Sequence, residues 1–191
     1  MSTPSRNETQ LICDILGLES LVDDITSKQL AGSTSAVLTD SAILGPFWRA
    51  NAPILPMGSS IVHLPSTAAA EHTYLHGRVL SAASGRPLEN AVLDIWHTAP
   101  NGLYEQQDPN QVDMNLRGRF ITAADGKYAI YCLRPTTYPI PGDGPAGKLL
   151  QLLDRHPMRP AHIHFIVSAP LCARRLLTRS TKPRLQSCGT F

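Results

Sequence analysis

The sequence predicts a mainly β protein, built as an antiparallel β-sandwich and preceded by a short helical segment. Its 191 residues are enough for one domain with a hydrophobic core. With 42% hydrophobic and 17% charged residues, the composition is that of a folded protein rather than a disordered one. The decisive observation is a series of short apolar runs separated by turn motifs, which favours a sandwich over alternating strands and helices.

The helical segment is expected over residues 9–30, with Asn7 as a suitable N-cap. Gly17 interrupts the pattern, so two shorter helices are an alternative. The apolar stripe that predicts this segment recurs at steps of three and four residues and consists of Leu11, Ile15, Leu18, Val22 and Ile25.

Five strands are expected after residue 75. The predicted strands are His76–Ser81, Ala91–His97, Arg119–Thr122, Lys127–Cys132 and His162–Ser168, with turns at 84–87, 100–102 and 124–126. In the second of these runs, residues 92, 94 and 96 alternate with residues 93, 95 and 97, so this strand should present two distinct faces.

Two irregular regions frame these strands. Residues 44–58 are rich in proline and glycine and form part of a long connection over 32–75. Residues 133–160 are similar, with a short helical patch at Lys148–Asp154. Long loops inside a compact domain usually carry function, so candidate site residues are sought there.

Composition also narrows the function class. A formal net charge of +2 gives no reason to expect nucleic-acid binding, and the basic residues after Leu171 fit a solvated chain end. Neither a signal peptide nor a membrane span is predicted. The four cysteines are scattered and are expected to be free thiols in a cytoplasmic protein.

His162 and His164 are two residues apart on a predicted strand, so both imidazoles point to one face and could bind a metal together. An equally simple alternative is one core histidine and one surface histidine. Tyr104 and Tyr138 lie in loops, where a tyrosine alone is usually a packing residue. Taken together, two tyrosinates and two imidazoles would favour ferric iron over zinc or copper(I), because phenolate oxygen is a hard anionic donor.

The motifs around these residues resemble one family. RPAHIHFIVSAP (159–170), NGLYEQQDPNQ (101–111), NLRGRF (115–120), RPTTYPIPGDGPAGKLL (134–150), LGPFW (44–48) and the run from His76 to Gly102 occur in the order found in the intradiol ring-cleavage dioxygenases. Within that family the chain is most similar to the hydroxyquinol 1,2-dioxygenase branch, beside the catechol and chlorocatechol enzymes. The resemblance covers about Thr9 to Pro170.

The resemblance implies a transthyretin-like catalytic core that holds one Fe(3+) per chain. The implied iron ligands are Tyr104 and His162, which stay in place, and the axial pair Tyr138 and His164. Arg159 and Tyr138 would act in catalysis. The residues implied to contact the substrate are Leu44, Gly45, Pro46, Phe47, Ile140, Pro141 and Arg159.

The implied reaction inserts both atoms of O2 into hydroxyquinol (1,2,4-trihydroxybenzene) or a catechol, giving maleylacetate or cis,cis-muconate. The partners would be the aromatic diol or triol and O2. The family is homodimeric, but most of its dimerisation helices are missing from this sequence. We therefore expect four segments. Residues 1–31 would be a remnant of the helical dimerisation region, 32–75 a linker that lines the pocket, 76–170 the catalytic sandwich, and 171–191 an aberrant, disordered tail.

The tail is where the sequence departs from the family, which continues after A-P with a loop and two more strands. Without those strands the sandwich would keep an unpaired edge. Two alternatives to an active dioxygenase therefore remain. One is a truncated, inactive relative, and the other is a non-catalytic transthyretin-like module.

Overall fold

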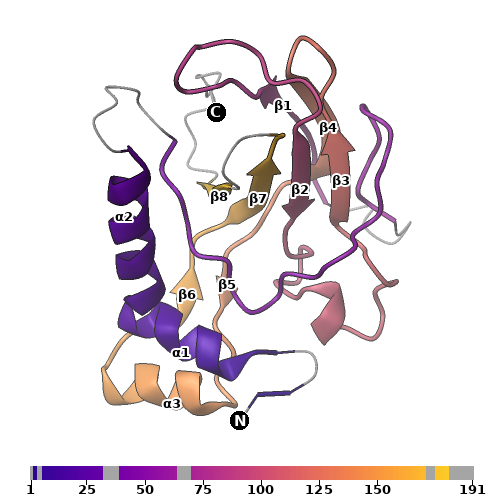
Figure 1. The fold of residues 1–191 in the computed structure, drawn as a ribbon. Coiled ribbons are helices and arrows are strands. Elements are labelled where there is room, and N and C mark those ends of the chain that lie inside the picture. The colour runs from indigo at the N-terminus through magenta and orange to yellow at the C-terminus, as the bar shows by residue number, and fades with distance from the viewer. Residues whose placement is uncertain (1, 4–5, 32–38, 64–69, 171–174, 181–191) are drawn as a thin grey trace.

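The computed structural model of the chain describes residues 2–3, 6–31, 39–63, 70–170 and 175–180. Two antiparallel sheets make up its centre (Figure 1). The larger has four strands in the order β3 (Arg117–Ile121), β2 (Val92–Trp96), β7 (His162–Ser168) and β8 (Arg175–Ser180). The smaller pairs β1 (His72–Arg78) with β4 (Lys127–Leu133).

The two sheets share one hydrophobic core, which confirms the predicted β-sandwich. Leu75 of β1 and Ile130 of β4 pack in the same cluster as Ile95 of β2, Phe120 of β3 and Phe165 of β7. Alternation along β2 explains the geometry: residues 93 and 95 enter this core, so residues 94 and 96 point to the other face of the sheet.

Most predicted strands are found with small shifts in their ends. β7 begins and ends where the sequence predicts it, and β4 extends one residue further. β1 is the largest discrepancy, since it covers His72–Arg78 instead of His76–Ser81. Its seven residues all pair with β4, whereas Leu80 forms only an isolated bridge to Pro87.

The N-terminal segment is two helices, as the interrupted pattern allowed. α1 (Glu8–Leu16) begins at Asn7, whose side chain accepts a hydrogen bond from the Gln10 amide, and ends at Gly17, which has φ +74°. α2 (Leu18–Ala31) follows directly. α3 (Pro145–Leu152) begins three residues earlier than predicted, with proline in its first turn, and packs its apolar side against α1. Within the described residues, no helix is both long and apolar enough to cross a membrane.

The C-terminal end differs from expectation. The sequence predicts no strand beyond Pro170, yet β8 pairs with six consecutive residues of β7, His162–Val167. β7 is therefore flanked on both sides in this structure, by β2 and β8. The rest of the expected tail, residues 171–174 and 181–191, lies outside the described residues, and so do Cys172 and Cys188, while Cys13 and Cys132 are free thiols.

Candidate metal centre

Three separate pieces of backbone bring the four candidate ligands together. His162 and His164 lie on the same face of β7. Tyr138 begins β5 (Tyr138–Pro139), and Tyr104 immediately precedes the short 3-10 helix η2 (Glu105–Gln107). All four side chains are buried, at 6% exposure or less.

The P-N-G turn brings the two tyrosines close to each other. Gly102 has φ +80°, a conformation that side-chain-bearing residues rarely adopt, and a Cβ atom there would lie 3.0 Å from Cβ of Tyr138. Glycine therefore permits both the turn and the close approach of the Tyr104 loop to the Tyr138 strand.

The four donor atoms form a closed ring of contacts. Oη of Tyr104 lies 3.2 Å from Oη of Tyr138 and 3.3 Å from Nε2 of His164. Nε2 of His162 lies 3.4 Å from Oη of Tyr138 and 3.0 Å from Nε2 of His164. Tyr138 and His164 thus occupy opposite corners of the ring, as do Tyr104 and His162.

This spacing fits a shared cation. For imidazole and oxygen donors bound at about 2.1 Å, separations like these correspond to angles of about 90–110° at the metal. Two phenol oxygens and two imidazole nitrogens are also a donor set suited to a hard ferric ion. The residues present therefore fit a mononuclear iron site.

The histidines are held in the form that a metal requires. Nδ1 of His162 donates to the carbonyl oxygen of Pro160 at 2.7 Å, which leaves the Nε2 lone pair facing the other donors. Burial, followed by the charge of Arg159, lowers the pKa of His162 to about 4. Burial, followed by His162 and Arg159, lowers the pKa of His164 well below its usual value. Both rings are therefore neutral at pH 7.

The tyrosines need a cation to ionise. Burial and the neighbouring Tyr138 raise the pKa of Tyr104 well above its usual value near 10. A bound cation would reverse this effect, since metal coordination deprotonates its ligands. Metal binding at this site should therefore be coupled to loss of phenol protons.

Arg159 is placed beside the ring by a second short ladder. β5 pairs with β6 (Met158–Arg159), and Tyr138 is the register partner of Arg159. Nη1 of Arg159 donates to Oη of Tyr138 at 3.2 Å, and its guanidinium carbon lies 5.9 Å from the centre of that ring. The predicted catalytic pair is therefore in contact.

Aromatic packing orients two of the ligands. Trp96, the register partner of His164 on β2, stacks on the His164 ring at 4.6 Å with an interplanar angle of 1°. Phe47 stacks on Tyr104, also at 4.6 Å between ring centres. Both contacts restrict ring rotation around the candidate metal position.

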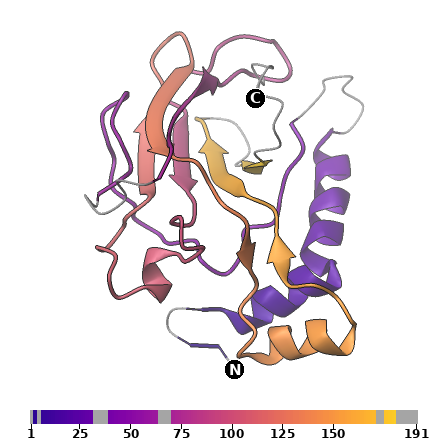
Figure 2. The ribbon, with the colours of Figure 1, turned by 180° about the vertical axis from the view of Figure 1, so that it is seen from behind.

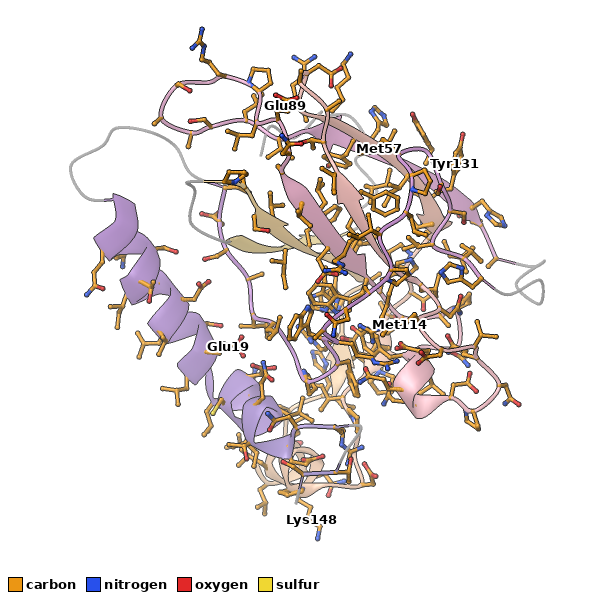
Figure 3. The ribbon with its side chains drawn as sticks, turned by 45° about the vertical axis from the view of Figure 1, so that its right-hand side comes forward. Glu19, Met57, Glu89, Met114, Tyr131 and Lys148 are labelled. Carbon is orange, nitrogen blue, oxygen red and sulfur yellow. The ribbon has the colours of Figure 1, made fainter. Side chains whose placement is uncertain are left out.

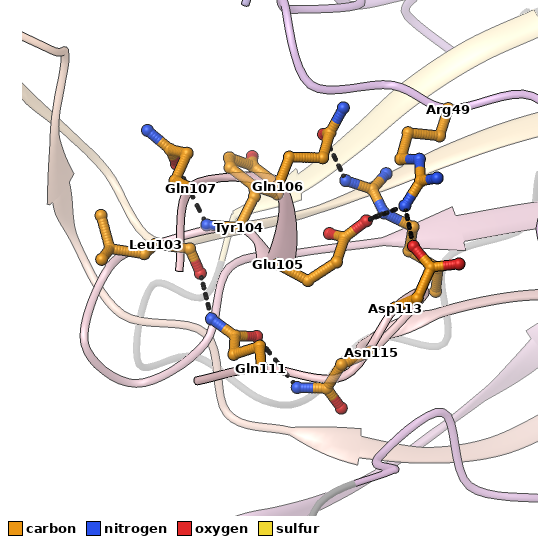
Figure 4. A network of polar contacts seen from close by, with 10 residues as sticks. Arg49, Leu103, Tyr104, Glu105, Gln106, Gln107, Gln111, Asp113 and Asn115 are labelled. Atoms are coloured by element: carbon orange, nitrogen blue, oxygen red, sulfur yellow. Dashed lines mark hydrogen bonds and ion pairs between the residues drawn. The ribbon is translucent and has the colours of Figure 1, made fainter. Parts of the chain in front are cut away.

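A polar network behind Tyr104 was not anticipated (Figure 4). The fully buried Arg117 donates from Nε to Oε1 of Glu105 at 2.7 Å and from Nη2 to Oε1 of Gln106 at 2.9 Å. Its guanidinium carbon lies 5.8 Å from the centre of the Tyr104 ring. A charged residue inside the short strand R-G-R-F was the available signal, because a buried arginine needs a partner.

The predicted substrate residues lie on two sides of the ring of four donor atoms. Phe47, Pro141 and Tyr138 help to line a cavity of about 520 Å³, whereas Ile140 and Arg159 help to line a second one of about 360 Å³. Leu44 packs against the apolar cluster around Tyr104 and Tyr138. A Cβ atom on Gly45 would lie 3.9 Å from both Nη1 of Arg159 and Cε1 of His164, so this segment passes directly over the site.

Two protein-family models match the chain. A family model described as "Dioxygenase" matches residues 43–181, and one described as "Catechol dioxygenase N terminus" matches residues 1–34. The chain belongs to the intradiol ring-cleavage dioxygenase family. The first match reaches past Pro170 and includes β8, so the family likeness extends beyond the motifs seen in the sequence.

Two curated relatives are similar over most of the chain. The intradiol ring-cleavage dioxygenase prcA of Aspergillus niger is 49% identical over 170 residues, which are 89% of this chain and 53% of prcA. A catechol 1,2-dioxygenase of Candida albicans is 47% identical, over 89% of this chain and 54% of the relative. The chain thus spans about half the length of the curated relatives it matches.

Solved structures give the same fold. Hydroxyquinol 1,2-dioxygenase from Pseudomonas putida superposes with a TM-score of 0.80 at 39% identity, covering 93% of this chain and 59% of that one. Catechol 1,2-dioxygenase from Acinetobacter radioresistens gives 0.83 at 31% identity, covering 91% and 56%. These likenesses confirm the predicted family and the predicted sandwich.

Proposed function

We propose that this chain binds one Fe(III) through Tyr104, Tyr138, His162 and His164 and acts as an intradiol dioxygenase on hydroxyquinol or a catechol. The observation that carries the proposal is the closed ring of two phenol oxygens and two imidazole nitrogens with Arg159 beside it. The iron would hold both hydroxyl oxygens of the diol and make its ring reactive toward O2.

The protein supplies position and charge. β7 holds His164 through ladders on both edges and His162 through its ladder with β8. Tyr138, at the corner opposite His164, would be the iron ligand that gives way to substrate, and its phenol oxygen would be the group that takes a proton from a diol hydroxyl. Arg159 donates to that oxygen in this structure and would stabilise negative charge on the aromatic ring of a bound substrate.

The choice between substrates rests on the relatives. Those most similar to the chain include a catechol 1,2-dioxygenase and a hydroxyquinol 1,2-dioxygenase from Rhizobium, the latter 43% identical. We propose maleylacetate as the product from hydroxyquinol and cis,cis-muconate from catechol. The Phe47 and Pro141 side of the site offers apolar walls that suit a flat aromatic ring.

The test combines spectroscopy with turnover on one sample. Purified protein loaded with Fe(III) should show a visible charge-transfer band from tyrosinate to iron, bind one iron per chain, and consume O2 with hydroxyquinol or catechol. Tyr104→Phe should shift the band and reduce the iron content, whereas Tyr74→Phe, at a tyrosine that is 53% exposed, should change neither. Protein that binds stoichiometric iron but stays colourless would contradict the ligand assignment.

A further inference from the structure

Helix α2 contacts residues 41–44 of the same chain through a polar stripe. Glu19, Asp23 and Ser27 are spaced four residues apart and therefore share one face of the helix. Oε1 of Glu19 accepts a hydrogen bond from the Leu44 amide at 2.7 Å. The Ser41 hydroxyl donates to Oδ2 of Asp23 and lies 3.1 Å from the Ser27 hydroxyl.

The apolar side chains of α2 do not contribute to this contact. Leu18, Leu21, Val22 and Ile25 are 47–55% exposed, and no residue of α2 with a described side chain belongs to a hydrophobic core cluster. In the described part of the chain, the contact between α2 and residues 39–44 is therefore made by hydrogen bonds. Figure 3 shows Glu19 on the side of the helix that faces this segment.

The segment held by Glu19 leads directly into the candidate metal centre. Gly45 follows Leu44 and adopts φ +73°, and a Cβ atom added to it would lie within van der Waals range of Arg159 and His164. Phe47, two residues further, stacks on Tyr104. Consecutive Cα atoms are about 3.8 Å apart, so movement at the Leu44 amide must displace the backbone above the site.

We propose that Glu19 is a positioning residue that fastens the segment Leu44–Phe47 over the metal centre, so that helix α2 sets the wall of the substrate pocket. The proposal rests on the proposed function only in taking this segment as a pocket wall; the bond itself is independent of iron. A carboxylate that accepts from a backbone amide makes a strong hydrogen bond, and its loss shifts a local docking equilibrium on the order of 10- to 100-fold.

The carboxyl group of Asp14, next to Glu19, does not oppose the proposed role of Glu19. Burial, and then the adjacent Glu19, raise the pKa of Asp14 to about 8. Asp14 is therefore neutral at pH 7, and Glu19 faces no second negative charge from it.

Amide hydrogen exchange of the iron-free full chain tests the proposal directly. A peptide covering residues 44–47 reports only three amides, because Pro46 has none. In Glu19→Ala these amides should exchange about 10-fold faster or more than in the wild type, and in Glu19→Gln, whose amide oxygen can still accept, the change should be smaller. Asp24→Ala removes the same charge from an exposed position of α2 and should leave exchange unchanged.

A second measurement separates positioning from general loosening of the helix. In iron-loaded enzyme, Glu19→Ala should raise KM severalfold with a smaller effect on kcat, while the charge-transfer band stays in place, because no ligand is altered. Unchanged exchange at 44–47 in Glu19→Ala would overturn the proposal, and so would equal acceleration in Asp24→Ala. Since exchange needs neither iron nor turnover, this result stands apart from any failure of the proposed activity.

Discussion

Replacing Arg117 by methionine tests how the position of Tyr104 is secured. Arg117 is buried and bonds to Glu105 and Gln106, the two residues that follow Tyr104 in the chain. Methionine fills a similar volume without charge, so the main change is electrostatic. It leaves the Glu105 carboxylate, whose side chain is 3% exposed, with Arg49 as its remaining ion-pair partner, 3.0 Å away.

The size of the expected destabilisation depends on how well Arg49 can pair with Glu105 alone. Removing one member of a buried ion pair costs about 3–5 kcal/mol when the other charge is left unpaired. Arg49 offsets part of this cost, but its side chain is 30% exposed and also binds Asp113. We therefore expect Arg117→Met to lower the free energy of unfolding by about 2–4 kcal/mol, against about 1 kcal/mol or less for Arg49→Met.

Denaturant unfolding of the iron-free protein measures both values, with unchanged m-values as the sign that the same transition is observed. The double variant Arg117→Met with Glu105→Gln removes the stranded charge. It should therefore be more stable than the sum of the two single effects predicts. A loss below about 1 kcal/mol in Arg117→Met, or strict additivity in the double variant, would refute the reasoning from a buried pair.

The same variant has a spectroscopic consequence. The Arg117 charge lowers the pKa of Tyr104, against the larger opposing effect of burial, so it favours the phenolate. Its removal should raise the energy of the phenolate electrons and move the charge-transfer band of iron-loaded protein to longer wavelength. Arg49→Met, whose charge does not lie over the ring, should leave the band where it is.

Three further predictions concern the rest of the molecule. Because burial and then Glu19 raise the folded-state pKa of Asp14 to about 8, the stability it contributes is complete below about pH 4 and is lost as pH rises to about 8. Asp14→Asn should remove this loss and be more stable than the wild type at pH 9, measured by denaturant unfolding. Gly147→Ala should cost about 1–3 kcal/mol, because its Cβ would overlap the backbone of Gly142, whereas Gly142→Ala has open space and should cost far less. Burial raises the pKa of the Cys132 thiol to about 12, so peptide-level alkylation at pH 8 should label it only after unfolding.

Features of the fold that depend on neighbouring residues can be predicted from the sequence, whereas features that depend on pairing between distant strands cannot. The break at Gly17, the N-cap at Asn7 and the bounds of β7 are local features, and the sequence predicts them correctly. The start of β1 was misplaced because only Leu75 in that strand is buried, so its alternation is weak and pairing with β4 decides its ends. β8 could not be predicted, since its place is determined by the edge of β7.

The difference between local and distant interactions also applies to the candidate metal centre. The four ligands were identifiable because a family's motifs surround each of them, and the structure brings all four together. Arg117 and Glu19 act through partners 12 and 25 residues away in the chain. The charged residue in the strand R-G-R-F signals that a partner is needed, but no local pattern identifies that partner or the contact made by Glu19. Both contacts depend on how distant segments of the chain meet in the fold, which Figure 2 shows from behind.

The way each ligand is anchored also indicates which one can move. His164 lies where β7 is paired on both edges, so displacing its imidazole by backbone movement would break two ladders. His162 is paired with β8 alone, but that ladder has six residue pairs. Tyr138 stands on a ladder of only two residue pairs, beside the glycine-bearing turn at 100–102. A ligand that must yield to an incoming diol needs this weaker support, because local opening costs least where few backbone hydrogen bonds are lost. The sheet therefore holds Tyr138 more weakly than either histidine, which supports its proposed role as the ligand that would give way. Tyr104 lies outside any strand and is held by the stacking of Phe47 instead. Hydrogen exchange should show faster opening at residues 138–140 than along β7, and equal protection of the two segments would contradict this assignment.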